Sequence, residues 1–145
     1  MTSAAVVAYH RQNREVKISY AGHPPVLYKR STDKSWAYIR RLKTNWERQG
    51  FPLNLPLAID ETTQYPEISL PVLPGDRFII YTDGIIDTPN ILGKPFGLTR
   101  LKNVLDENSE SPLPVLKSAV LKRLERFSEN ALNHDDITLI VLEIS

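Results

Sequence analysis

The segment from Arg77 to Asp87, RFIIYTDGIID, constrains the fold more than any other part of the chain. Large apolar or aromatic residues fill every position from Phe78 to Tyr81, so a strand here must be covered on both faces. A Pro74-Gly75 turn precedes this strand, and Asp83-Gly84 follows it. The sequence therefore predicts an inner strand that ends at a carboxylate beside a glycine, which suits a hard divalent cation.

The same kind of site recurs near the end of the chain, where Asp135-Asp136 leads into the apolar run from Ile137 to Ile144. Taken alone, either acidic pair is more often part of a turn or of the start of a strand. Together, they favour two neighbouring inner strands that bring Asp83 and Asp135 close enough to share a metal site.

The composition excludes several classes of function. The chain has 145 residues, enough for one domain or part of one, and a net charge of +1, which selects neither nucleic acid nor membrane as a partner. It contains no cysteine, which excludes disulfides, thiolate metal sites and a cysteine nucleophile. No apolar run approaches the roughly 20 residues of a membrane span. We therefore expect a cytoplasmic protein.

The remaining pattern predicts an α+β fold with about six strands and three helices. Alternating residues predict a hairpin in the first 20 residues, and prolines mark an edge strand near residue 70. Apolar residues at helical spacing predict helices near Leu98 and after Pro112. The predicted elements are strands at 4–9, 16–20, 26–28, 67–72, 78–81 and 137–144, and helices at 31–50, 98–105 and 112–130.

The predicted helix from Ser31 to Gly50 has a basic outer face that includes Arg40 and Arg41. Three interpretations remain open for it. A solvated surface is the default, a flap that contacts a phosphorylated substrate is the second, and nucleic-acid binding is the weakest because no recognition motif accompanies it.

Five motifs, in this order, resemble the metal-dependent protein serine/threonine phosphatases of the PPM type. Within that group they resemble the bacterial branch named for the sporulation protein SpoIIE, and the resemblance covers nearly the whole chain. The motifs are YAGHPPVLY (20–28), LPLAI (55–59), LPGDRFIIYTDGIID (73–87), GKPFGLTRL (93–101) and DDITLIVLEI (135–144).

The resemblance implies part of a four-layer α/β/β/α sandwich with mainly antiparallel sheets. It implies a two-metal Mg²⁺ or Mn²⁺ centre that hydrolyses phosphoserine or phosphothreonine with a metal-activated water, and it names no catalytic residue beyond the metal ligands. It also implies a phosphorylated anti-sigma-factor antagonist as the substrate, and a sensor domain upstream. The resemblance implies Asp83 and Asp135 as metal ligands, and we add Asp87 as a ligand that reaches an outer ion through water. Gly84, Asp136 and His23 are expected in support: Asp136 bonds backbone donors or orients its neighbour, and His23 is more often a structural corner residue than a general acid.

The chain departs from this family at its front. The family has an earlier Gly-Asp motif whose aspartate bridges both metals, and Gly75-Asp76 lies at the wrong end of the central strand to replace it. Residues 1–145 are thus expected to be the C-terminal portion of one phosphatase domain, with a basic helical insertion at about 31–50 and little activity alone. The alternative hypothesis is a non-catalytic module that binds a partner or forms a homodimer through exposed strand edges.

Overall fold

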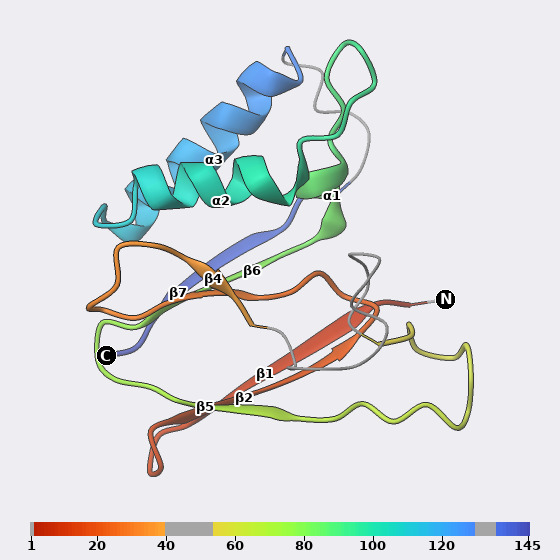
Figure 1. Ribbon diagram of the computed structural model, residues 1–145, viewed down its shortest axis with the longest axis vertical. Helices are drawn as coiled ribbons and strands as arrows, with labels where there is room; N and C mark the ends of the chain where they lie inside the picture. The colour runs from red at the N-terminus through yellow and green to blue at the C-terminus, as the bar shows by residue number, and fades with distance from the viewer. Residues whose placement is uncertain (1, 40–53, 130–135) are drawn as a thin grey trace.

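The computed structural model describes residues 2–39, 54–129 and 136–145, which form three stacked layers. Figure 1 shows the helices above a first sheet, and a second sheet beneath it. Each layer has one apolar face or stripe that is buried against its neighbour, which is the usual reason for such stacking.

The three-stranded sheet has the order β1-β2-β5 and is antiparallel throughout. Strands β1 (Ala4–His10) and β2 (Glu15–Ala21) form the predicted hairpin, and β5 (Ile68–Pro71) is the predicted proline-bounded edge strand. Alternation along β2 buries Val16, Ile18 and Tyr20 and leaves Lys17 and Ser19 on the outer face.

The four-stranded sheet has the order β4-β3-β6-β7 and is also antiparallel. Its strands are β3 (Leu27–Lys29), β4 (Ala37–Tyr38), β6 (Arg77–Tyr81) and β7 (Leu139–Glu143). The inner position of β6, between β3 and β7, agrees with its continuous apolar sequence.

Three helices cover one face of the four-stranded sheet (Figure 1): α1 (Asp83–Asp87), α2 (Gly97–Glu107) and α3 (Leu113–Phe127). The predicted stripes are buried, with Leu101, Val104 and Leu105 on α2 and Leu116, Val120 and Leu124 on α3. None of the described helices is long and apolar enough to cross a membrane.

Two apolar cores lie on opposite faces of the four-stranded sheet. Ile79 and Tyr81 of β6 pack into the helical layer, whereas Phe78 packs between the two sheets with Val16 and Ile18. This division explains why β6 requires apolar residues at consecutive positions.

The prediction of a helix that begins at residue 31 is wrong in the part that the structure describes. Residues 31–39 form turns and the short strand β4, and residues 40–53 lie outside the described ranges. Trp36 packs into the helical core, whereas Ile39 packs between the sheets. Two residues three apart on a strand point to opposite faces. Because both faces are buried here, the spacing resembles a helical stripe.

Candidate functional site

The antiparallel pairing of β6 with β7 brings the end of one strand to the start of the other. Tyr81, the last residue of β6, pairs with Leu139, the first residue of β7. One residue beyond Tyr81, the Thr82 hydroxyl donates to the Asp136 carbonyl at 3.2 Å and accepts from the Thr138 N–H at 2.9 Å. The two segments that carry the predicted ligands therefore meet at one edge of the sheet.

Asp83 and Asp87 are the first and last residues of α1, and both are exposed. Between them, Gly84, Ile85 and Ile86 are buried and anchor this short helix in the helical core. Residues four apart lie on the same face of a helix, so the two carboxylates share the solvent-facing side of α1. Like charges at this spacing repel each other by a few tenths of a kcal/mol, which a bound cation would relieve.

The other predicted site residues are placed only in part. Asp135, Arg40 and Arg41 lie outside the described residues. Asp136 is described and exposed, and it contributes its backbone carbonyl to the Thr82 contact. Within the described ranges, no group of three or more histidine or acidic residues is positioned to hold a metal ion.

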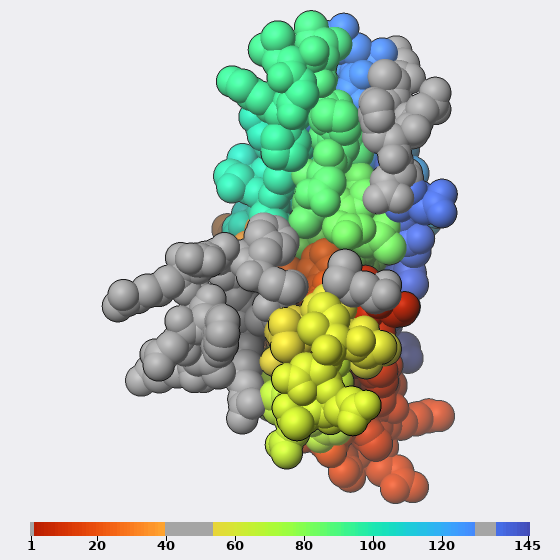
Figure 2. All heavy atoms as spheres, turned by 90° about the vertical axis from the view of Figure 1, so that its right-hand side faces the viewer, coloured from red at the N-terminus to blue at the C-terminus, as the bar shows by residue number. Residues whose placement is uncertain are grey.

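The AGHPP corner lies at the same end of the four-stranded sheet as Asp83, since β3 and β6 are antiparallel with Leu27 opposite Ile79. The Nδ1 atom of His23 lies 2.8 Å from the Pro24 carbonyl, which holds the ring within the corner. The corner packs against the LPLAI segment, where a Cβ on Gly22 would lie 2.5 Å from Cγ of Pro56. Figure 2 shows this end of the molecule, with residues near 60 below α1 and the loop that follows it.

Sequence reasoning missed two threonines of this site. Thr82 occupies the N-cap position of α1, but its hydroxyl bonds to Asp136 and Thr138, in the segment before β7, instead of capping the helix. Thr88 is buried after the last residue of α1, and its hydroxyl donates to the Gly84 carbonyl at 2.6 Å. A threonine just before Asp-Gly is a helix-start signal, and that signal identifies Thr82 in retrospect.

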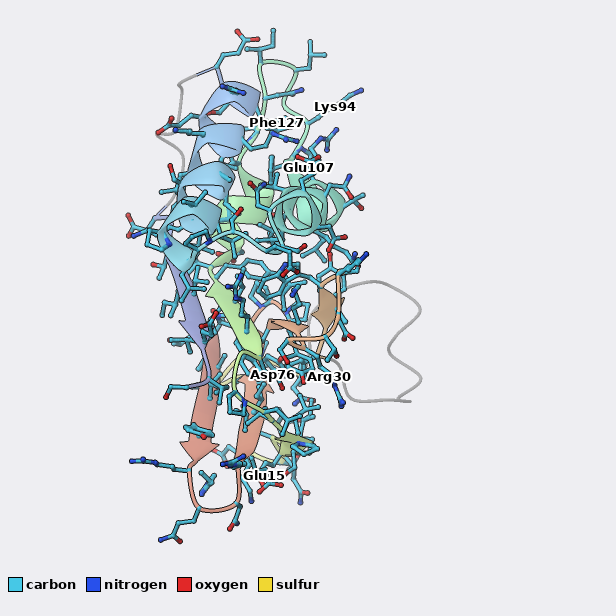
Figure 3. The ribbon with its side chains drawn as sticks, turned by 90° about the vertical axis from the view of Figure 1, so that its left-hand side faces the viewer. Glu15, Arg30, Asp76, Lys94, Glu107 and Phe127 are labelled. Atoms are coloured by element: carbon cyan, nitrogen blue, oxygen red, sulfur yellow. The ribbon has the colours of Figure 1, made fainter. Side chains whose placement is uncertain are left out.

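Asp76, of the Gly75-Asp76 pair, is unavailable to a metal. It lies at the opposite end of β6, is 2% exposed, and accepts hydrogen bonds from the Tyr28 hydroxyl and from the N–H groups of Ser31 and Leu73. Figure 3 shows it beside Arg30, away from Lys94 at the helical end. Burial and the Asp76 carboxylate raise the pKa of Tyr28 to about 12.

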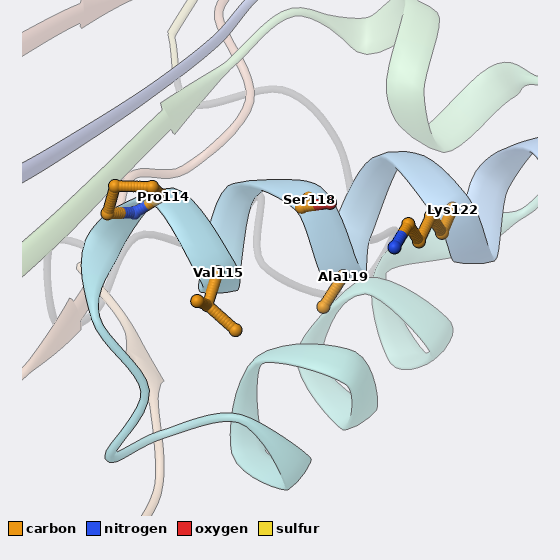
Figure 4. Close-up of a pocket in the computed structure, with 5 residues that line it drawn as sticks. All are labelled: Pro114, Val115, Ser118, Ala119 and Lys122. Carbon is orange, nitrogen blue, oxygen red and sulfur yellow. The ribbon is translucent and has the colours of Figure 1, made fainter.

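A shallow cavity of about 390 Å³ lies on the outer side of α3 (Figure 4). It is lined by Pro114, Val115, Ser118, Ala119 and Lys122. None of these is a predicted site residue, so the candidate site remains the edge where β6, α1 and β7 meet.

Comparison with known families gives one match over the whole chain. The family described as Stage II sporulation protein E (SpoIIE) matches residues 1–145. Among curated proteins, the chain is 30% identical over 122 residues to Protein IcfG of Synechocystis, covering 84% of this chain and 17% of that protein. It is 24% identical over 124 residues to the phosphoserine phosphatase RsbP of Bacillus subtilis, covering 86% of this chain and 26% of that protein.

Solved structures share the fold. The SiaA-PP2C domain of Pseudomonas aeruginosa superposes with a TM-score of 0.76 at 22% identity, covering 99% of this chain and 52% of that one. The Mn-presoaked phosphatase domain of SpoIIE from Bacillus subtilis gives a TM-score of 0.69 at 15% identity, covering 98% and 56%. The chain thus spans about half the length of these two structures and less of the curated relatives. On the match over residues 1–145, it belongs to the SpoIIE family of PPM-type phosphatase domains, of which it forms a part.

Proposed function

We propose that this chain supplies Asp83 and Asp135 as ligands of a divalent metal centre that removes phosphate from phosphoserine or phosphothreonine. The observation that carries the proposal is the meeting of β6 and β7 at Thr82, because Asp83 and Asp135 each directly adjoin a residue of that contact. Asp87 shares the exposed face of α1 with Asp83 and is proposed as a ligand of an outer ion.

The donor set fits a hard cation. Asp83 and Asp87 are exposed carboxylates, and oxygen ligands with room for water suit Mg²⁺ or Mn²⁺. When bound, such ions lower the pKa of water and offset charge on phosphate oxygens. The chain's own contribution is rigidity: Ile85 and Ile86 fix α1 in the core, and Thr82 joins it to Thr138, the residue before β7. Gly84, Asp136 and His23 are proposed to support the site.

The chain is proposed to need further parts of a domain for activity. Asp76 is buried and accepts three hydrogen bonds, so the bridging aspartate that the family resemblance implies is proposed to come from outside residues 1–145. A fourth, helical layer is proposed to cover the outer face of β1-β2-β5, where Val6 is 64% exposed. Residues 1–145 are then the C-terminal portion of the domain, with an upstream sensor domain in the same cytoplasmic protein.

The substrate is proposed to be a phosphorylated anti-sigma-factor antagonist. The match to the phosphoserine phosphatase RsbP supports the phosphoserine chemistry. The similar structure of the RsbU and RsbW domains of one Mycobacterium tuberculosis protein supports a regulatory partner. Arg40 and Arg41 are proposed to contact the substrate. Charge reversal at both positions tests this by its effect on turnover of the phosphoprotein.

The experiment is Mn²⁺-dependent hydrolysis of an aryl phosphate by the complete protein. We expect Asp83→Asn and Asp135→Asn each to lower kcat/KM by more than ~10-fold and to weaken Mn²⁺ binding measured by calorimetry. The matched control is Asp33→Asn, an exposed carboxylate outside the site. If both variants keep full activity, the ligand assignment is wrong.

A second candidate function is a non-catalytic module that pairs with another copy. It is favoured by two of the edge strands, β1 and β7, where Val6, Ile140 and Leu142 are more than two-fifths exposed. Sedimentation and Mn²⁺ titration calorimetry of the complete protein distinguish the two, since a stable dimer that does not bind Mn²⁺ supports the second.

A further inference from the structure

The loop between α1 and α2 presents two apolar side chains at its tip. Ile91 and Leu92 are 70% and 73% exposed, the highest fractions among large apolar side chains in the described residues. Single exposed apolar residues are ordinary, but two consecutive ones at the tip of one loop form a small continuous patch. Figure 2 shows the segment around residues 90–97 standing out at the top of the molecule, beyond α1.

The loop is held rigidly by its own hydrogen bonds. The Asn90 side-chain oxygen accepts from the N–H groups of Leu92 and Lys94, at 3.0 and 2.9 Å. The Asn90 N–H donates to the Lys94 carbonyl, and Pro89 pairs with Pro95 across the base. A rigid loop loses little conformational entropy on binding, so its apolar tip is suited to contact a partner.

The base of the loop is anchored to the helical layer. Phe96 is fully buried and packs edge-on against Phe127 of α3, with ring centroids 5.3 Å apart. Arg100 lies 4.9 Å from the Phe127 ring centroid and donates to the Pro95 and Phe96 carbonyls. The fold therefore fixes the tip relative to α1, while no packing within the described residues requires Ile91 or Leu92 to be apolar.

The charge around the tip indicates the kind of partner. Of the three basic residues between α1 and the end of α2, Arg100 donates to the Pro95 and Phe96 carbonyls and Lys102 pairs with Asp106, so Lys94 carries the positive charge beside the tip. Figure 3 shows Lys94 at the outer edge of the helical end, and no ion pair of Lys94 occurs within the described residues. This surface is complementary to an apolar pocket with an acidic rim.

The tip is also close to the candidate site. Ile91 follows Asp83 by eight residues, four along α1 and four along the loop. At about 1.5 Å per helical residue and about 3.6 Å per extended residue, the Cα atoms of Asp83 and Ile91 lie at most roughly 20 Å apart. A standard protein interface of ~800 Å² per partner is about 30 Å across, so one folded partner can span both.

We propose that Ile91, Leu92 and Lys94 form a docking surface for the folded protein that carries the phosphorylated residue. This inference rests on the proposed function and adds a contact outside the metal centre. A phosphoprotein is favoured over a membrane because a single lysine flanks the tip and the chain has a net charge of only +1.

The experiment compares three substrates with the complete protein and Mn²⁺: an aryl phosphate, a phosphopeptide of about ten residues, and the whole phosphorylated anti-sigma-factor antagonist. We expect the double variant Ile91→Ser, Leu92→Ser to raise KM for the whole phosphoprotein about tenfold. We expect Lys94→Glu to raise it about threefold at low salt and less at high salt. The aryl phosphate and the short peptide, which do not reach the tip, keep their kinetic constants.

The matched controls are Leu73→Ser, which removes a 58% exposed leucine near the other end of β6, and Lys117→Glu on α3. Unchanged phosphoprotein kinetics in the double variant would overturn the docking surface while leaving the phosphatase proposal intact. An equal effect on all three substrates would also overturn it, as would loss of binding to anionic phospholipid vesicles with unchanged kinetics. Absence of aryl phosphate hydrolysis in the unmodified protein contradicts the proposed function instead.

Discussion

The hydroxyl of Thr82 lies 3.2 Å from the backbone carbonyl of Asp136, and this contact joins the end of β6 to the segment that leads into β7. The same hydroxyl accepts from the Thr138 N–H, so one side chain closes the sheet edge where the ligand-bearing segments meet. A substitution at Thr82 therefore removes no carboxylate from the candidate site. It changes the distance between the two segments that carry the predicted ligands.

Thr82→Val keeps the shape of the side chain and removes both hydrogen bonds. We expect the Mn²⁺ affinity of the complete protein to fall about 10-fold, as is usual when groups behind metal ligands are lost. Isothermal titration calorimetry measures this directly. Thr138→Val is the control, because it keeps the backbone N–H that Thr82 accepts. Equal Mn²⁺ affinity in the two variants would show that the contact does not position the site.

The elements that could be predicted from the sequence are those with a clear period. Alternation identified the β1–β2 hairpin, the continuous apolar run identified β6, and helical spacing identified α2 and α3. Pairing of β6 with β7 was also predicted, but the inner position expected for both strands holds only for β6. Within the described residues β7 is the edge strand of its sheet, and Ile140 and Leu142 are more than two-fifths exposed. The role of Asp135 stays a prediction, since that residue lies outside the described ranges.

The elements that could not be predicted lack such a period. Helix α1 has five residues, too few for a helical pattern to show, and its two isoleucines read as a continuation of the strand. In residues 31–39, Trp36 and Ile39 enter different cores on opposite faces of one sheet. No local pattern separates that case from a helix, because it depends on which distant segments cover each face.

Gly22→Ala tests the contact between the AGHPP corner and the LPLAI segment. Gly22 has a φ of +63°, and a Cβ there would lie 2.5 Å from Cγ of Pro56. We expect a loss of more than ~2 kcal/mol in the free energy of unfolding, from left-handed strain plus the clash. Urea denaturation followed by circular dichroism measures it.

Gly93→Ala is the control for the backbone term, because Gly93 has a φ of +72° with no atom within 4 Å of the added Cβ. Gly93→Ala should lower the free energy of unfolding only by the left-handed backbone strain, roughly 1–2 kcal/mol. Pro56→Ala combined with Gly22→Ala should recover part of the loss, since it removes the nearest clashing atom. Equal losses for the two glycine variants would show that the corner can move away from Pro56.

Tyr28→Phe tests the buried contact with Asp76. Because burial raises the pKa of Tyr28 from 10.0 to about 12, the folded state favours the protonated phenol. That contribution to stability is complete below pH 10 and is lost as the pH rises from 10 to about 12. In this window, we expect the free energy of unfolding of Tyr28→Phe to fall less steeply than that of the unmodified chain, by up to ~1.4 kcal/mol per pH unit.

The measurement is urea denaturation at several pH values between 8 and 12, with Tyr9→Phe as the control, since Tyr9 is 43% exposed. Asp76 keeps the N–H groups of Ser31 and Leu73 as donors in Tyr28→Phe. If the free energy of unfolding of Tyr28→Phe and of the unmodified chain fell equally steeply with pH, groups other than Tyr28 would cause the loss of stability at alkaline pH.

Trp36→Phe tests whether the segment before β4 caps helix α2. The indole N–H of Trp36 donates to the Leu105 carbonyl at 3.1 Å, in the last turn of α2, where carbonyls lack helical partners. Phenylalanine keeps an aromatic ring in the core but gives up part of the indole's buried area and leaves that carbonyl unsatisfied, so we expect a loss of ~1–3 kcal/mol in the free energy of unfolding. Tyr38→Phe is the matched control: its hydroxyl donates to the Leu98 carbonyl, in the first turn, which the helix already satisfies. Thermal unfolding should rank Trp36→Phe well below Tyr38→Phe, and a reversed order would mean that the indole contributes packing alone.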